Sequence, residues 1–113
     1  MQEKRRAFAI IARHGSAPVG FKLGYEQLRE EFYSWLGGVH PEYRRRGIAR
    51  DLLLKQHEWC RRTGYACVST EALNDNAAML ALNLEHGFRI VGTRVDDRGL
   101  KILLSRRLRM KEP

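Results

Sequence analysis

A run of arginines followed by a glycine carries the clearest chemical signal in the sequence. It reads Arg44-Arg45-Arg46-Gly47-Ile48-Ala49 and lies between an apolar stretch that ends at Val39 and the start of a helical pattern. The first N–H groups of a helix have no partner within the helix, and the helix dipole adds positive potential there. Gly47 allows close approach to the main chain. The segment therefore predicts a loop that binds phosphate or pyrophosphate.

Two well-known phosphate-binding patterns do not fit this loop. The sequence lacks Gly-x-x-x-x-Gly-Lys-Ser/Thr, and it also lacks Gly-x-Gly-x-x-Gly. Taken by itself, the segment is explained as well by an arginine-rich, solvated loop before an ordinary helix.

Two further segments carry residues that a ligand site needs. Gly37-Gly38-Val39 closes an aromatic-rich stretch, and paired glycines at a strand end predict a bulge or the close approach of a ligand to the backbone. Asn76 stands before the apolar run 77–85, where it is a natural helix cap, and Gly87 ends that run.

The elements that must position these residues follow from the periodicity of the apolar residues. Three strands precede a helix, and a strand, a short helix and a final hairpin follow it. The expected strands are 7–12, 19–25, 32–39, 65–70, 89–95 and 100–108, the helices are 47–62 and 77–85, and the polar stretch 26–31 is a connection. The strands on either side of the first helix are parallel, because a helical crossover joins them. This order predicts an α/β (α+β) fold with a mixed sheet.

Length and composition restrict the classes of protein to which the chain can belong. The 113 residues predict one domain, 1–113, and the 43% hydrophobic and 30% charged residues are typical of a globular protein. The longest apolar runs have six residues, too few for a membrane span. Cys60 and Cys67 do not have the spacing of a metal or redox motif, so we expect two free thiols, no metal and a cytoplasmic protein.

The two motifs together resemble the GNAT superfamily of N-acetyltransferases. That family binds the pyrophosphate of acetyl-CoA with Arg/Gln-x-x-Gly-x-Gly/Ala, which 44–49 match, and 39–43 form a common lead-in. The segment 76–88 matches the family's Asn-x-x-Ala/Met…Gly-Phe helix and turn. The resemblance covers about residues 7–108. It implies a mainly antiparallel sheet with one parallel crossover and two flanking helices.

The resemblance also implies a reaction and a cofactor site. The acetyl group of acetyl-CoA, the co-substrate, would pass to a primary amine by direct attack. The main chain of Gly37, Gly38 and Val39 would pair with the pantetheine, and the Val39 N–H would face the thioester oxygen as an oxyanion donor. Asn76 would contact the cofactor as well as cap its helix. The groups expected around the pyrophosphate are Arg44, which fixes the loop, and Arg45, Arg46, Gly47, Ile48, Ala49 and Arg50.

The chemical roles of two residues are less directly implied. Many family members carry a tyrosine that protonates the departing thiolate, and Asn83 stands at that position here. An amide is no acid at neutral pH, so Asn83 is expected to contact the pantetheine or a water instead. The amine must be neutral to attack, which requires a base. Glu31 aligns best with the family's base, while Glu26 and Glu30 compete with it.

Several questions about partners stay open from the sequence. The amine acceptor is unidentified, and Tyr33 and Trp35 either line its cleft or belong to the sheet core. The chain begins at what would be the family's second strand, which leaves 7–12 at a sheet edge and favours a homodimer.

Two other functions compete with acetyl transfer. One is a CoA-binding protein without activity. The other is a basic nucleic-acid-binding module, suggested by the net charge of +8, although no recognised nucleic-acid motif supports it.

Overall fold

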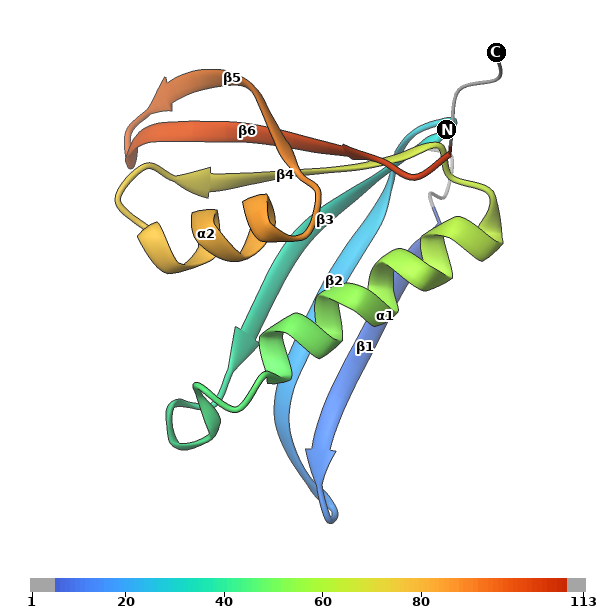
Figure 1. The fold of residues 1–113 in the computed structure, drawn as a ribbon, viewed down its shortest axis with the longest axis vertical. Helices are drawn as coiled ribbons and strands as arrows, with labels where there is room; N and C mark the ends of the chain where they lie inside the picture. Colours follow the sequence, from blue (N-terminus) through green and yellow to red (C-terminus); the bar gives the residue numbers. More distant parts are fainter. Residues whose placement is uncertain (1–5, 110–113) are drawn as a thin grey trace.

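The computed structural model describes residues 6–109, which form one six-stranded sheet and two α-helices (Figure 1). The elements, in chain order, are β1 (Ala7–His14), β2 (Ala17–Leu28), β3 (Glu31–Val39), the 3-10 turn η1 (Pro41–Tyr43), α1 (Ile48–Thr63), β4 (Cys67–Leu73), α2 (Ala77–Glu85), β5 (Arg89–Asp96) and β6 (Gly99–Arg107).

The order of the strands across the sheet is β1-β2-β3-β4-β6-β5. All neighbours are antiparallel except β3 and β4, which α1 joins as a parallel crossover. The expected mixed α/β fold is therefore confirmed, and β1 lies at a sheet edge as predicted.

Several strand boundaries differ from the prediction: β1 continues to His14, β2 begins at Ala17, and β4 covers 67–73 instead of 65–70. The stretch 26–31 is only partly a connection, because β2 continues to Leu28. The N–H of Glu26 donates to the carbonyl of Arg6 at 2.7 Å, and its side chain accepts from the Tyr65 hydroxyl at 2.7 Å. Tertiary contacts thus hold polar residues in a strand that their composition alone does not favour.

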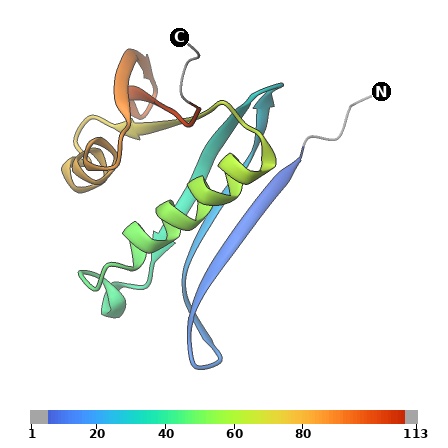
Figure 2. The same ribbon diagram turned by 45° about the vertical axis from the view of Figure 1, so that its right-hand side comes forward.

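Two glycines in left-handed backbone set the ends of α1. Gly47, before its first residue, has a φ of 82°, and Gly64, after its last, has a φ of 107°. The Gly64 N–H donates to the carbonyls of Cys60 and Arg61, which closes the helix. The buried side chains recur three or four residues apart, so α1 lays one face along β1, β2 and β3 (Figure 2). They are Leu52, Leu53, Gln56, His57 and Cys60.

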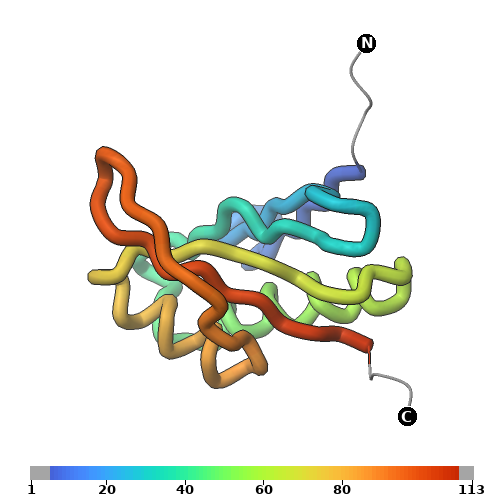
Figure 3. The backbone as a smooth tube through the Cα atoms, turned by 90° about the horizontal axis from the view of Figure 1, so that it is seen from above, coloured from blue at the N-terminus to red at the C-terminus, as the bar shows by residue number. Residues whose placement is uncertain are grey.

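Both helices cover the same face of the sheet (Figure 3). The core lies between that face and the helices, and it contains the fully buried Phe32, Leu53, Val68 and Leu104. Side chains alternate across a strand, so Tyr25, Tyr33 and Trp35 point to the opposite face, which no helix of the described residues covers. Within residues 6–109, no helix is long and apolar enough to cross a membrane.

Candidate functional site

The site begins where the two parallel strands separate. β3 and β4 pair only over three residues on each strand, from Glu31 with Cys67 to Tyr33 with Ser69. The Thr70 hydroxyl then donates to the Ser34 carbonyl at 2.8 Å. Beyond that point the strands diverge, as Figure 1 shows. The last part of β3 therefore has a partner on its β2 side but not on its β4 side.

A bulge in β3 helps to open this split. Leu23 pairs with Leu36 and Gly24 with Ser34, so Trp35 is the extra residue. We expected a bulge or a close approach by a ligand at Gly37-Gly38. The bulge lies just before that pair, while both glycines stay in register with β2.

The backbone direction of β3 follows from one hydrogen bond. The His40 N–H donates to the Val19 carbonyl at 2.7 Å, toward β2. Because hydrogen-bonding directions alternate along an antiparallel strand, Val39 and Gly37 direct their N–H and carbonyl groups toward the split. The Val39 carbonyl accepts from Nε of Arg44 at 3.2 Å. The Val39 N–H and both polar groups of Gly37 therefore face the split.

The arginine loop lies at the open end of the split. η1 follows β3, and the His40 side chain caps it through a 3.1 Å bond from the Glu42 N–H. Arg45 has a φ of 65° and Gly47 a φ of 82°, which turn the chain into α1. No side chain caps α1 at Gly47, so the first N–H groups of the helix face the loop.

The arginines of the loop do not all point the same way. Arg44, Arg45 and Arg50 line the cleft, whereas Arg46 lies over the Tyr43 ring at 4.9 Å from its centroid. Arg46 is therefore in the predicted loop, but its side chain is not part of the cleft lining.

The loop, the end of β3 and α2 enclose a cleft of about 610 Å³. The structure brings most of the predicted cofactor residues to this one place. Those that line the cleft are Gly37, Gly38, Val39, Arg44, Arg45, Gly47, Ile48, Ala49, Arg50 and Asn76.

The two asparagines of the second motif differ in their surroundings. Asn76 lines the cleft and also caps α2, since its Oδ1 accepts from the Met79 N–H at 3.3 Å. Asn83 is 3% exposed and does not line the cleft. Its carbonyl accepts from the N–H groups of His86 and Phe88. The contact of Asn83 with the cofactor thus stays a prediction, without a placement in the lining to support it.

Lys22 is a cleft residue that the sequence analysis missed. It lines the cleft from β2, and its Nζ lies 3.5 Å from the position that a Cβ on Gly37 would take. Burial lowers the pKa of this lysine. Among residues 6–109, its Nζ makes no hydrogen bond or ion pair. The available signal was its position between Gly20 and Gly24 on the inward face of β2.

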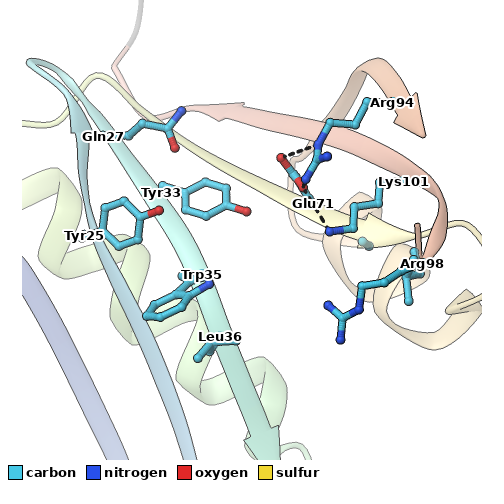
Figure 4. Close-up of a pocket in the computed structure, with 11 residues that line it drawn as sticks. Tyr25, Gln27, Tyr33, Trp35, Leu36, Glu71, Arg94, Arg98 and Lys101 are labelled. Carbon is cyan, nitrogen blue, oxygen red and sulfur yellow. Dashed lines mark hydrogen bonds and ion pairs between the residues drawn. The ribbon is translucent and has the colours of Figure 1, made fainter. Parts of the chain in front are cut away.

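A second cavity, of about 450 Å³, opens on the helix-free face (Figure 4). Tyr25, Tyr33 and Trp35 line it from β2 and β3. Tyr33 and Trp35 therefore belong to a cavity wall, whereas Phe32 of the same strand lies in the core. The facing wall carries Glu71 and three basic residues, Arg94, Arg98 and Lys101. Burial, and then the negative charge of Glu71, raise the pKa of Tyr33.

Glu31 lies away from both cavities. It pairs with Cys67 at the closed end of the split, and its Oε2 accepts from the Ser69 hydroxyl at 2.7 Å. Along β3 it is about 26 Å from Val39, at about 3.3 Å per residue. The structure therefore does not bring the two predicted catalytic residues together. Within residues 6–109, no cluster of three or more His, Cys, Asp or Glu side chains is placed to hold a metal.

Comparison with known proteins identifies the family. The family model "Acetyltransferase (GNAT) family" matches residues 1–88. The chain belongs to the GNAT acetyltransferase family. The resemblance predicted from the two motifs is thus confirmed, and the cleft described above lies within the matched part of this GNAT chain.

Solved structures agree with this assignment at the level of the fold. The ribosomal-protein-S18-alanine N-acetyltransferase of Escherichia coli superposes with a TM-score of 0.86 at 22% identity, over 97% of this chain and 74% of that one. A GNAT acetyltransferase of Elizabethkingia anophelis with acetyl-CoA bound superposes with a TM-score of 0.84 at 19% identity, over 88% of this chain and 75% of that one. An N-acetyltransferase of Thermoplasma acidophilum in complex with coenzyme A superposes with a TM-score of 0.78 at 16% identity, over 90% of this chain and 61% of that one. A search of curated protein sequences found no match.

Proposed function

We propose that this GNAT chain transfers the acetyl group of acetyl-CoA to a primary amine, as one domain over residues 1–113 in the cytoplasm. The observation that carries this proposal is the cleft itself. It joins main-chain groups of β3 that face the split to an arginine-lined helix start. An elongated ligand with a pyrophosphate at one end and amide groups along its length fits this arrangement.

The two ends of acetyl-CoA are bound by different chemistry. The N–H groups at Ile48, Ala49 and Arg50, with the guanidinium groups at the loop, bind the pyrophosphate. The pantetheine runs along β3 and pairs with the outward groups of Val39 and Gly37, as an added strand would. The thioester oxygen then accepts from an N–H of this edge, for which Val39 is our predicted donor. This bond strengthens as negative charge develops on the oxygen.

The amine reaches the thioester from the opposite face of the sheet. The aromatic cavity lies on that face, and Trp35 and Leu36 line it just before the glycines of the cleft. A neutral amine held there attacks the carbonyl carbon directly, and the carbon–sulfur bond breaks as the carbon–nitrogen bond forms. The second cavity therefore serves as the acceptor side of the site.

The predicted base, Glu31, lies about 26 Å along β3 from Val39, so in this proposal it could take the proton of the amine only through a chain of several waters. Glu71 lies nearer, but both of its carboxylate oxygens already accept from Arg94, at 2.8 and 3.3 Å. The variant Glu31→Gln keeps the shape of the side chain and removes the carboxylate. We expect it to lower kcat/KM most at low pH, where the amine carries its proton.

The deciding experiment separates an active enzyme from a protein that binds CoA without turnover. Purified protein is incubated with acetyl-CoA and a panel of amines, including amino acids, peptides and diamines. Release of free thiol is followed in solution, and mass spectrometry detects the acetylated amine. Thermal stabilisation by acetyl-CoA together with amine-dependent thiol release supports the proposal. Stabilisation without release over the whole panel favours the inactive CoA-binding protein, and no stabilisation refutes both.

A further inference from the structure

The basic residues of the second cavity differ in whether a carboxylate lies close enough to pair with them. Arg94 binds Glu71, with 2.8 Å between Nη2 and Oε1, and it also reaches Asp96 at 3.4 Å. Lys101 lies 3.1 Å from Asp96 and 3.9 Å from Glu71. Two cations and two carboxylates are thus paired with one another, and neither carboxylate is left for a positively charged ligand.

Arg98 is the remaining cation. Its backbone is fixed in the β5–β6 turn, because its N–H donates to Oδ1 of Asp96 at 2.9 Å. Figure 4 shows its guanidinium reaching from this turn toward Leu36 on the other wall. In the described part of the chain, the Arg98 side chain makes no ion pair or hydrogen bond. The cavity therefore presents one unpaired guanidinium opposite an aromatic wall.

On the basis of the proposed function, we propose that the acceptor is an amine that also carries a carboxylate and an apolar or aromatic part. The guanidinium of Arg98 binds the carboxylate through two parallel hydrogen bonds. Tyr25, Tyr33 and Trp35 pack against the apolar part. An acceptor with several positive charges would meet Arg94, Arg98 and Lys101 with no free carboxylate, so polyamines are poor acceptors.

Matched acceptors test the proposal directly. The substrates are L-phenylalanine against L-phenylalanine amide, and C-terminally amidated dipeptides with amino-terminal phenylalanine followed by either aspartate or lysine. Wild-type protein should favour the carboxylate or aspartate member of each pair. The variant Arg98→Gln should raise KM for that member about tenfold, since a charge-assisted bond is lost. KM for phenylalanine amide should stay within twofold.

Two controls keep the outcomes distinct. Arg89→Gln removes an exposed arginine of β5 that does not line the cavity, and it should leave both substrates unchanged. Thermal stabilisation by acetyl-CoA should be the same in Arg98→Gln as in wild type, which checks the fold and the cofactor cleft. Equal use of both members of each pair by active wild-type protein would overturn the acceptor class while the proposed acetyl transfer stands.

A second inference rests on a separate observation, the lysine in the cofactor cleft. Lys22 lies across the bare backbone of Gly37, where its side chain reaches the split. The positive charges of Arg106 and Lys22 both contribute to the lowered pKa of His57. Within the described range 6–109, the Lys22 ammonium group thus has no protein partner and stands beside the part of β3 that would hold the thioester.

The geometry points to Lys22 as the group that protonates the departing thiolate. The amine nitrogen forms the bond to carbon, and the carbon–sulfur bond breaks with its electron pair on sulfur. The ammonium of Lys22 donates one proton to that sulfur and becomes a neutral amine. The product nitrogen loses one proton through water to the proposed base, which passes it to solvent, and solvent returns a proton to Lys22, so that atoms and charges balance. Burial, which lowers the pKa of Lys22, makes this donation easier.

Leaving-group dependence distinguishes this role from a structural one. Lys22→Met keeps the length of the side chain and removes the proton, and Lys22→Gln is a second, polar variant. With acetyl-CoA we expect kcat to fall about 100-fold, within the usual range for a lost acid. With the thioester of thiophenol, whose thiolate leaves without protonation, the loss should shrink to less than tenfold. Lys55→Met, on the exposed side of α1, should lose nothing with either donor.

Two results would overturn the assignment of Lys22. The first is full acetyl-CoA turnover in both Lys22 variants. The second is an equal loss with both thioesters, which would mean that Lys22 supports binding or folding and not proton transfer. Stabilisation by CoA, measured for each variant, reports on the cleft independently of turnover.

Discussion

Nη1 of Arg106 lies 2.7 Å from Nδ1 of His57, in a hydrogen bond that joins β6 to α1. A guanidinium only donates hydrogen bonds, so Nδ1 accepts and Nε2 carries the proton of the neutral ring. Nε2 is buried and has no hydrogen-bond partner in the part of the chain that the structure describes. Burial, and then the charge of Arg106, lower the pKa of His57 to about 3. The bond links α1, which packs against β1, β2 and β3, to β6, which lies on the β4 side of the split.

The lowered pKa of His57 predicts that the protein loses stability in mild acid. Its folded-state pKa lies below the unfolded value of 6.5, so the unfolded state takes up a proton first as the pH falls. The contribution of neutral His57 to the free energy of unfolding is fully present above pH 6.5 and is lost between pH 6.5 and about 3. Each pH unit in that window should cost up to about 1.4 kcal/mol from this group. Urea unfolding at pH 7.5, 6.0 and 5.0 measures it.

The variant His57→Phe isolates the contribution of this group. It fills a similar volume and cannot take up a proton, so its stability should vary less between pH 7.5 and 5.0 than that of the wild type. His14→Gln, in the exposed end of β1, should keep the wild-type dependence. Identical pH dependence in His57→Phe and wild type would contradict a buried, neutral His57.

Gly47→Glu should abolish the stabilisation by acetyl-CoA. The new carboxylate would stand at the helix start that is proposed to bind the pyrophosphate. At about 100 times its dissociation constant, the ligand should stabilise the wild type by about 2.7 kcal/mol, seen as a rise in Tm. The variant should show no rise in Tm with millimolar acetyl-CoA.

The control for this substitution must share its backbone strain. Gly64→Glu introduces a side chain at another positive φ, 107°, with no atom within 4 Å of the new Cβ and outside the cleft. Both variants should lose about 1–2 kcal/mol of stability from the left-handed backbone. Only Gly64→Glu should keep the response to acetyl-CoA, and a normal response in Gly47→Glu would remove the loop from the proposed site.

Asn83→Ala should leave the chemical step nearly unchanged, because an amide supplies no proton. The side chain is buried and not part of the cleft lining, so its removal should lower the Tm rather than kcat. Asn83→Tyr, which the resemblance suggested as a gain of an acid, should instead overpack this site and cost about 1–3 kcal/mol. Steady-state kinetics beside thermal unfolding separates these effects. A several-hundred-fold drop in kcat for Asn83→Ala, with binding intact, would show that Asn83 acts in the reaction.

The predicted homodimer can be tested at the free edge of β1. The Glu26 N–H donates to the Arg6 carbonyl, so by alternation the N–H of Ala9 points away from β2. Ala9→Pro therefore blocks pairing with a second chain without losing a bond within the sheet. Light scattering at micromolar concentration should give a dimer for the wild type and a 13 kDa monomer for the variant. Ile10→Pro removes a bond to β2 and should destabilise the fold itself. A monomeric, fully active wild type would rule the dimer out.

The sequence by itself determined the order of the elements and the place of the arginine loop before α1. Residues 44–49 are proposed to bind the cofactor mainly through main-chain N–H groups at a helix start, and Gly47 and Gly64 set the ends of that helix through local backbone geometry. Such features depend on neighbours in the chain, so a motif of a few residues specifies them. The second motif predicted its helix and the Asn76 cap for the same reason.

Tertiary structure decided what the two walls of the site contain. The register between β2 and β3 makes Trp35 the bulge residue, and it places Lys22 opposite Gly37, which has no side chain. Arg94 and Glu71 met because β5, β6 and β4 lie side by side. Glu31 aligned with the family's base in sequence, yet the short β3–β4 pairing holds it at the closed end of the split. Contacts between residues far apart in the chain depend on strand register, and the local pattern of each strand leaves that register undetermined.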